Sequence, residues 1–272
     1  MAIAQLTKKI NVPLPARASG IFMSSSLLLD SFAPQRKVGQ ERNQLVKESG
    51  TKMKLIGAFL IALEHSGPEE SEEHDYAACI SALKGIKFTS KDICDFPKDA
   101  FSFGSSAGYE DGVVSTALGL FISSLVNTCD QKRFSIDLRG GPRLDYLGYM
   151  CCKQLTVHGN VGGCTGISLA NGHLVVNGNA EDNTGIFMYG GKITINGNVG
   201  AGVGGYMCSG LITVNGKCFG TVGGDSIDNG SVIRINGNIV GQIYSNMGGG
   251  DVYQYGKRLV KDGVKIHPIE NK

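Results

Sequence analysis

The chain has 272 residues, which is enough for one large domain or two ordinary ones with a substantial core. Its 26 basic and 24 acidic residues leave a formal net charge of +2, so the charge predicts neither a nucleic acid nor a membrane surface as partner. The 40 glycines are unusual, because only 10 of them fall in residues 1–133 and 30 fall in residues 134–272. This asymmetry indicates two differently built halves.

The first residues were considered as a targeting segment. Residues 1–29 contain no acidic residue and four serines, which is typical of an organelle transit peptide. With only three basic residues and the two prolines Pro13 and Pro15, however, the segment would be a poor transit peptide. We therefore expect a cytoplasmic protein without a secretory signal. The longest apolar stretches, residues 57–63 and 113–126, are shorter than the roughly 20 residues that a membrane-spanning helix needs.

The cysteines show no C-x-x-C pair that would suggest a metal or redox site. We expect reduced thiols that act as small buried hydrophobic side chains, with Cys151 and Cys152 as a buried or rim pair. The eight cysteines are Cys79, Cys94, Cys129, Cys151, Cys152, Cys164, Cys208 and Cys218.

Residues 1–133 are predicted to be mainly helical. One helix lies within residues 41–67 and is stopped by Gly67-Pro68. A second lies in residues 69–86, where acidic residues in the first turn favour the helix dipole, and a third, apolar helix occupies residues 111–129. We expect one of these helices to cover the first coil of the following region near Phe134, and this half contains no functional motif that we recognise.

Residues 134–256 repeat with a period near 19, which predicts a solenoid. The repeat is seen in the glycine that closes each apolar alternation, at spacings of 19, 19, 19, 19, 21 and 19 residues. These structural turn glycines are Gly140, Gly159, Gly178, Gly197, Gly216, Gly237 and Gly256. One coil cannot bury its own apolar face, whereas a stack of about seven coils can.

A strand is predicted before each turn glycine, because apolar residues alternate with polar ones there. The inward pairs are Ile136/Leu138, Leu155/Val157, Leu174/Val176, Ile193/Ile195, Ile212/Val214 and Ile233/Ile235. A further apolar ladder on the opposite wall consists of Met150, Leu169, Met188, Met207 and Met247. The fold class is therefore α+β, a helical region followed by a right-handed parallel β-helix.

Glycine is expected at the corners of the coil. The Asn-Gly pairs at Gly178, Gly197, Gly216 and Gly237 supply residues that tolerate a positive φ, and the outward asparagines before them form a structural ladder. Further corner glycines recur seven and thirteen residues after the turn glycine. They are Gly166, Gly185, Gly204 and Gly223, and Gly172, Gly191, Gly210 and Gly250.

Two departures from the period stand out. The coil between Gly216 and Gly237 has two extra residues, an acidic stretch and no residue of the methionine ladder, so we expect a protruding loop there. The last strand puts Gln254 in the inward position, which predicts a cap over an exposed parallel edge, followed by a tail at residues 257–272.

The stretch from Met188 to Gly220 resembles the GXGXG family of right-handed β-helices. Its phrase reads Met188-Tyr189-Gly190-Gly191-Lys192-Ile193 and then Gly197-Asn198. Residues 134–256 are similar to the carboxy-terminal domain of the glutamate synthase large subunit and to the C subunit of formylmethanofuran dehydrogenase. The resemblance implies a scaffold without catalytic residues that positions other subunits. It also implies that any flavin, iron–sulfur or metal cofactor belongs to a partner subunit.

Several candidate sites were weighed against structural explanations. His158 and His173 occupy different positions of the repeat, so surface histidines are favoured over a metal pair. Asp225 and Asp228 could form an acid/base pair or a calcium loop, but a solvated loop is favoured. The sequence G-x-G-x-x-G at Gly200–Gly205 lies inside the repeat without a βαβ unit, so a dinucleotide site is not favoured.

The sequence therefore favours a non-catalytic scaffold or interaction subunit of a larger oxidoreductase complex, which binds other subunits and no cofactor directly. The alternative is a stand-alone, hydrolase-like enzyme whose site lies between the helical region and the solenoid, with Asp225, Asp228 and His158 as its candidate residues. A homo-oligomer formed by end-to-end stacking is a third possibility.

Overall fold

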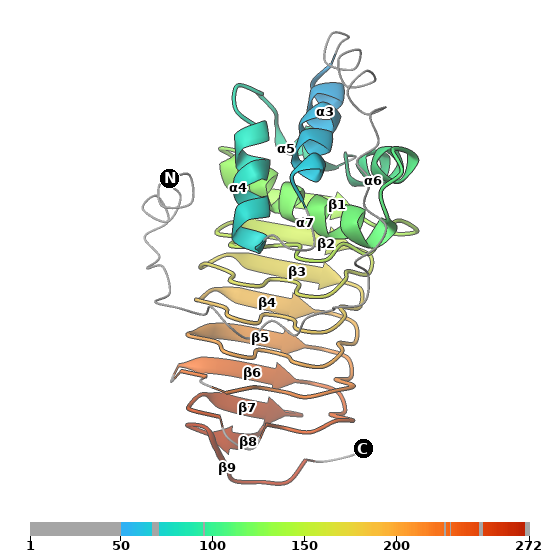
Figure 1. The fold of residues 1–272 in the computed structure, drawn as a ribbon. Coiled ribbons are helices and arrows are strands. Elements are labelled where there is room, and N and C mark those ends of the chain that lie inside the picture. Colours follow the sequence, from blue (N-terminus) through green and yellow to red (C-terminus); the bar gives the residue numbers. More distant parts are fainter. Residues whose placement is uncertain are drawn as a thin grey trace.

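The structure is a computed structural model, and it describes residues 50–66, 71–94, 96–225, 227–228, 230–244 and 247–269. The proposed targeting segment at residues 1–29 and the helix stop at Gly67-Pro68 lie outside the described residues. Within the described ranges, helices form the first half of the chain and stacked strands form the second, so the α+β fold class is confirmed (Figure 1).

The described part of the first half contains five helices. They are α3 (Thr51–Glu64), α4 (Glu72–Ala82), α5 (Ser90–Cys94), α6 (Phe96–Ser106) and α7 (Asp111–Thr128). The three predicted helices correspond to α3, α4 and α7. Ser71 caps α4 by accepting a hydrogen bond from the His74 backbone N–H, and acidic residues follow in the first turn as expected.

The short helices α5 and α6 were not predicted from the sequence. The side chain of Asp92 accepts hydrogen bonds of 2.8 Å from the backbone N–H and the hydroxyl of Thr89, which holds the chain at the start of α5. Pro97 lies in the first turn of α6, where a missing N–H is tolerated. The aromatic rings of Phe59, Phe96 and Phe121 join α3, α6 and α7 at centroid distances of 5.6 to 6.4 Å.

The second half is a parallel β-solenoid of about six turns. Its parallel strands are β1 (Arg133–Asp137), β2 (Gln154–His158), β3 (His173–Asn177), β4 (Lys192–Ile195), β5 (Gly210–Val214), β6 (Ser231–Ile235) and β7 (Asp251–Gln254). Each strand pairs with the next in sequence, and Figure 1 shows them stacked below the helices. Isolated parallel bridges such as Val199 to Cys218 and Val203 to Val222 show that other walls of the coil also stack in register.

The register confirms the period of 19 in most coils and corrects it in the first. Phe134 pairs with Leu155 and Ile136 with Val157, so β1 and β2 are offset by 21 residues. Leu138, rather than Gly140, therefore occupies the repeat position of Gly159. The glycine spacing misled the prediction because Gly140 has a positive φ of 66° in a local turn of its own. The two extra residues between β5 and β6 are confirmed.

The predicted inward residues form buried ladders along the solenoid. The side chains of Leu174, Ile193 and Ile212 are fully buried, and the opposite wall is lined by Leu169, Met188 and Met207. In the coil that lacks a methionine, the buried side chain of Ile227 lies between these walls instead. Burial of these ladders stabilises each coil only in the presence of its neighbours.

At the four Asn-Gly pairs, glycine is required for a different reason from the predicted positive φ, which three other turn glycines, Gly140, Gly159 and Gly256, do have. Gly178, Gly197, Gly216 and Gly237 are not among the residues with a positive φ. A Cβ at Gly197 would instead lie 2.5 Å from the carbonyl oxygen of Gly178 in the preceding coil, and the other three positions are equally crowded. Glycine is required there because adjacent coils touch backbone to backbone. The corner glycines Gly166, Gly185, Gly204 and Gly223 do have the expected positive φ, between 70° and 82°.

The outward asparagines form the predicted ladder. Each side-chain amide donates a hydrogen bond to the side-chain oxygen of the preceding asparagine, at 2.6 Å from Asn196 to Asn177, 2.7 Å from Asn215 to Asn196 and 2.8 Å from Asn236 to Asn215. The ladder begins at His158, whose Nδ1 lies 3.3 Å from the amide of Asn177. His158 therefore has a structural partner.

Helix α7 covers the first coil of the solenoid, as expected. The Ser115 hydroxyl donates a 2.6 Å hydrogen bond to the carbonyl of Arg143, and the Ser123 hydroxyl accepts one of 2.9 Å from the Gly148 N–H. Asn127 donates to the carbonyl of Tyr149 and to the buried Tyr76 hydroxyl. These contacts satisfy backbone groups that an open coil would leave without partners.

The other end of the solenoid is also covered. After Tyr255 and Gly256 the chain reverses, and β8 (Lys257–Lys261) and β9 (Val264–Lys265) continue the sheet in antiparallel pairing. The start of the predicted tail is therefore part of the sheet. Gln254 is buried in the inward position, as predicted, and its amide donates to the carbonyl of Gly237.

The cysteines are free thiols, as predicted, and all eight lie in described parts of the chain. Cys151 is buried and Cys152 is partly buried, while Cys208 is exposed. None of the helices in the described ranges combines the length and the apolar character that a bilayer crossing requires.

Candidate functional site

The structure does not bring the predicted loop residues and His158 together. His158 ends β2, whereas Asp225 and Asp228 follow β5, three strands away, which corresponds to about 14 Å along the stack. The Asp225 carboxylate accepts a 3.3 Å hydrogen bond from the Tyr244 hydroxyl, and this interaction raises the pKa of Tyr244. Asp228 is held through its backbone N–H, which donates to the Met207 carbonyl.

The proposed cleft between the helices and the solenoid is occupied by packed backbone where α7 crosses the first coil. A Cβ at Gly119 would overlap the carbonyl oxygen of Asp145. The Asp145 carboxylate accepts hydrogen bonds from the Gly163 N–H at 2.6 Å and from the Ser115 hydroxyl at 3.2 Å. Burial raises the pKa of Asp145 despite these two donors, which act in the opposite direction.

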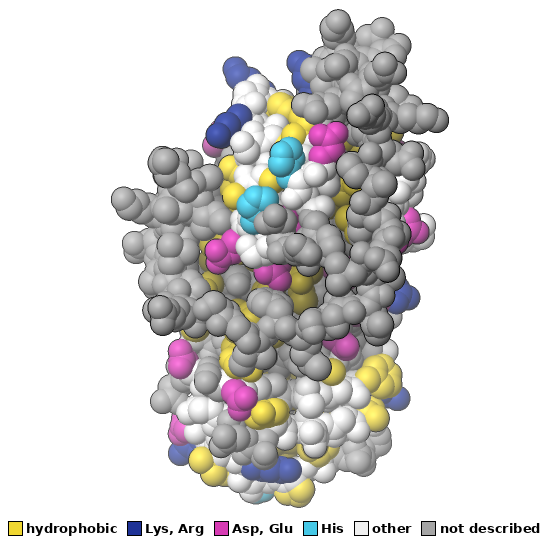
Figure 2. Space-filling view, viewed as in Figure 1, with side chains coloured by type: hydrophobic (Ala, Val, Ile, Leu, Met, Phe, Trp, Pro, Cys, Tyr) yellow, Lys and Arg dark blue, Asp and Glu magenta, His cyan; other side chains and the backbone are white. Residues whose placement is uncertain are grey.

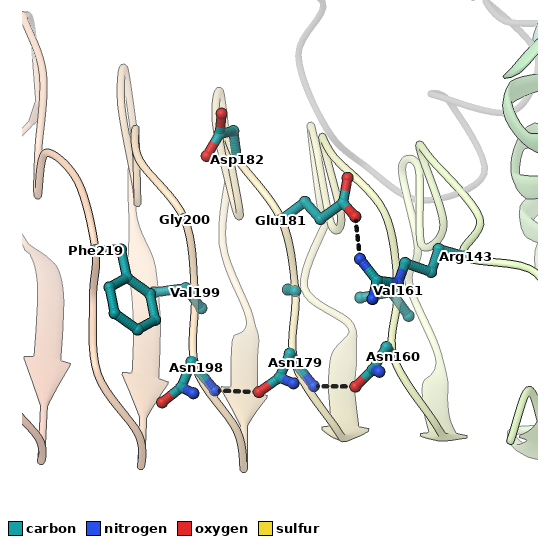
Figure 3. Close-up of a pocket in the computed structure, with 11 residues that line it drawn as sticks. Arg143, Asn160, Val161, Asn179, Glu181, Asp182, Asn198, Val199, Gly200 and Phe219 are labelled. Carbon is teal, nitrogen blue, oxygen red and sulfur yellow. Dashed lines mark hydrogen bonds and ion pairs between the residues drawn. The ribbon is translucent and has the colours of Figure 1, made fainter. Parts of the chain in front are cut away.

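A shallow groove on the side of the solenoid is a better candidate site. It has a volume of about 420 Å³ and runs across the turns that follow β2, β3, β4 and β5 (Figure 3). Its floor is made by the small apolar residues Val161, Ala180 and Val199, which occupy one position of the repeat. The groove therefore extends along the solenoid axis rather than along a strand.

One wall of the groove is a second row of asparagines, which differs from the ladder described above. The side-chain oxygen of Asn160 accepts a 2.9 Å hydrogen bond from the Asn179 backbone N–H, and that of Asn179 accepts one of 2.7 Å from the Asn198 N–H. Asn198 does the same for the Lys217 N–H. Figure 3 shows the three side chains in line, one on each coil.

The opposite wall is charged. Arg143 donates a 2.8 Å hydrogen bond to Glu181 in an exposed ion pair at one end of the groove. The Asp182 carboxylate accepts a 2.7 Å hydrogen bond from the Ala201 N–H and is exposed to solvent. With one ion pair and one further carboxylate, the side chains of this wall carry a single net negative charge.

An exposed aromatic ring closes the other end. Phe219 is 57% exposed and lies beside Val199 in Figure 3. Val240, in the same repeat position of the next coil, is 58% exposed, and its N–H donates to the Cys218 carbonyl. Phe219 and Val240, here called the lateral apolar pair, are the most exposed large apolar side chains on the coils described.

The sequence contained a signal for this site that the prediction did not use. The third residue after the five turn glycines from Gly159 to Gly237 is Gly162, Glu181, Gly200, Phe219 and Val240 in turn. Phe219 occupies a position that is glycine in two other coils, so its large side chain must project from the coil. Gly200, one coil earlier, has no side chain and leaves a hollow next to Phe219. The residue directly after the turn glycine is asparagine in four coils, which indicated the row at the wall.

Other predicted sites were examined in the structure. His173 begins β3 and pairs in register with Gln154, not with His158. The G-x-G-x-x-G stretch forms a coil between β4 and β5 and precedes no helix. Among the described residues, no group of three or more His, Cys, Asp or Glu side chains is placed to hold a metal ion.

Figure 2 shows one face of the molecule, on which acidic and basic side chains are scattered over the described surface and form no large patch of one sign. Comparison of the chain with models of protein families, with curated proteins and with solved structures gave no match.

Proposed function

We propose that this chain is a non-catalytic β-helical scaffold, an interaction subunit of a larger oxidoreductase complex in the cytoplasm. The observation that carries the proposal is the lateral apolar pair, in which Phe219 and Val240 are both more than half exposed on adjacent coils. Adjacent exposed apolar side chains on a rigid surface favour a protein partner, because their removal from water stabilises the complex.

The two closed ends of the solenoid support a lateral mode of binding. Helix α7 covers the first coil, and β8 and β9 cover the last one. Both coverings disfavour end-to-end stacking and leave the sides of the solenoid as its extended accessible surfaces. The resemblance to the GXGXG β-helices supports an oxidoreductase complex, formylmethanofuran dehydrogenase-like or glutamate synthase-like. Any flavin, iron–sulfur or metal cofactor would then be bound by the partner subunits.

The test is a tagged pull-down from native extract with the full chain and two variants, analysed by mass spectrometry and absorbance. We expect a stoichiometric partner with a flavin or iron–sulfur spectrum for the unaltered chain. Val240→Asp should abolish its capture, since a charge would be buried at the interface. Val264→Asp is the matched control, because Val264 is 65% exposed on β9 and lies at the covered end. A solitary, colourless protein, or equal capture by both variants, would overturn the proposal.

A further inference from the structure

We propose that the lateral groove binds a neutral oligosaccharide laid along the solenoid axis. This proposal goes beyond the scaffold function, and a sugar would compete with a protein partner for Phe219, which belongs to both surfaces. It rests on four features of the groove: a row of amide donors, the spacing of that row, the charge of the facing wall and an exposed aromatic ring at one end.

The asparagine row presents hydrogen-bond donors to the groove. In Asn160, Asn179 and Asn198 the side-chain oxygen already accepts a backbone N–H from the next coil, at 2.7 to 2.9 Å. Those bonds fix the orientation of each carboxamide. The NH₂ group, with its two donors, is then the part of each side chain that remains for a ligand oxygen.

The spacing of the row matches a sugar chain better than a peptide. Successive asparagines are one coil apart, about 4.8 Å. An extended peptide places carbonyls on the same side about every 6.7 Å, so its acceptors would fall out of step after one contact. A hexose unit is close to one coil in length, and its hydroxyl groups both donate and accept. Each unit of a linear oligosaccharide can therefore meet an amide on one wall.

The charge of the groove disfavours an anionic ligand. Arg143 is neutralised by Glu181 at 2.8 Å, and Asp182 adds one exposed carboxylate. An anionic ligand would therefore meet repulsion from Asp182, whereas a neutral one would not. Carboxylate oxygens accept hydrogen bonds from neutral hydroxyl groups without a change in net charge.

Phe219 provides a stacking surface at the end of the row. Its ring is 57% exposed beside Val199, which with Val161 and Ala180 makes an apolar floor. The C–H face of a sugar ring is apolar and can stack on this ring, while its hydroxyl groups point to the polar walls. The volume of about 420 Å³ falls within the range of ligand-binding sites and gives room for a short oligosaccharide.

The experiment is calorimetric titration of the full chain with cellotriose, laminaritriose and maltotriose, and with trigalacturonate as an anionic counterpart. We expect at least one neutral trisaccharide to bind and trigalacturonate to bind more weakly. Asn179→Ala removes the amide from the middle of the row, and it should weaken binding by about tenfold. Thr194→Ala, on the outer side of β4, removes a polar group away from the groove and should bind like the unaltered chain.

Phe219→Ala should also weaken binding by about tenfold, while Val264→Asp should leave it unchanged because Val264 lies on β9 and does not line the groove. Thermal melting of each variant checks that the fold is intact. Lack of binding by all three neutral trisaccharides at millimolar concentration would overturn the proposal. Binding that both Asn179→Ala and Phe219→Ala leave unchanged would do the same. If a copurified protein covers the groove and no sugar binds, the groove is a binding site for a peptide segment and the proposal is wrong.

Discussion

Gly119 in α7 lies directly against Asp145 in the first coil, and a Cβ at Gly119 would overlap the Asp145 carbonyl oxygen. Backbone therefore meets backbone where the helical half covers the solenoid. The neighbouring hydrogen bonds from Ser115 and Asn127 to the first coil depend on this distance.

We expect Gly119→Ala to destabilise the protein by about 3 kcal/mol, because the helix must move away from the coil and its hydrogen bonds must lengthen. Gly112→Ala in the same helix is the control, since nothing lies within 4 Å of a Cβ there. That change should stabilise the protein by about 0.5 kcal/mol. Urea unfolding measures both, and equal stabilities would contradict the close packing of α7.

The turn glycines make a second prediction, which separates crowding from backbone conformation. Gly197→Ala should cost about 3 kcal/mol because its Cβ would lie 2.5 Å from the Gly178 carbonyl oxygen. Gly140→Ala should cost only about 1 kcal/mol, since its φ is 66° but nothing lies within 4 Å. Thermal unfolding of the two variants tests this order, and a larger loss at Gly140 would restore the positive-φ explanation.

Substitution of an asparagine inside the ladder should destabilise the protein more than substitution of the asparagine at its end. Asn196→Ala removes one donated and one accepted hydrogen bond, to Asn177 and from Asn215. Asn236→Ala removes the bond donated to Asn215. Because these side chains are exposed, we expect losses of about 1 kcal/mol and about 0.5 kcal/mol. Chemical denaturation of both variants would detect this, and a larger effect at Asn236 would be inconsistent with a continuous ladder.

The free cysteines should react with iodoacetamide at very different rates. Cys208 is exposed, whereas burial raises the pKa of the Cys151 thiol to about 12 and that of Cys164 to about 11. At pH 8 the side chains of Cys151, which is buried, and Cys164, which is partly buried, are therefore neutral thiols, which are poor nucleophiles. Peptide mapping by mass spectrometry should find Cys208 modified first and Cys151 protected until the protein unfolds. Early modification of Cys151 would argue against its burial in the first coil.

Asp145 predicts a pH-dependent effect. Burial raises the pKa of its carboxyl in the folded state, so the charged form destabilises the fold at neutral pH. Stability from this group is greatest below the unfolded pKa of about 4 and is lost as the pH rises through the folded value. Asp145→Asn should therefore raise the melting temperature at pH 7, with the gain shrinking toward pH 4. Asp182→Asn is an exposed control, and a gain that is constant with pH would contradict this explanation.

The sequence predicted the solenoid well because its physical cause is periodic. The inward residues from β2 onward, the corner glycines Gly166, Gly185, Gly204 and Gly223, the buried Gln254 and the two extra residues after β5 can all be read at a fixed spacing. The first coil was misaligned because Gly140 imitates a turn glycine two residues from the true position. A local turn and a stacking contact both select glycine, and the sequence does not distinguish them.

The helical half and the groove were harder to predict from the sequence. Helix α5 has only five residues, and α6 contains Pro97 and Gly104, which are poor helix formers, so local propensity did not indicate either helix. The groove forms because Gly200 has no side chain, whereas Phe219 at the same position of the next coil has a large one. Such a hollow becomes visible only when the coils are placed side by side, and it contains no cluster of reactive groups that a sequence motif would indicate.

The constant register from β2 to β5 makes the coil a unit of length. Removal of residues 178–196 would join Asn177 to Gly197, and each would find the same kind of neighbour that it has now. A chain of this kind can gain or lose whole coils by duplication or deletion of one repeat while its ends stay covered. Its length is therefore adjustable, like that of a spacer cut to the distance between the parts it joins.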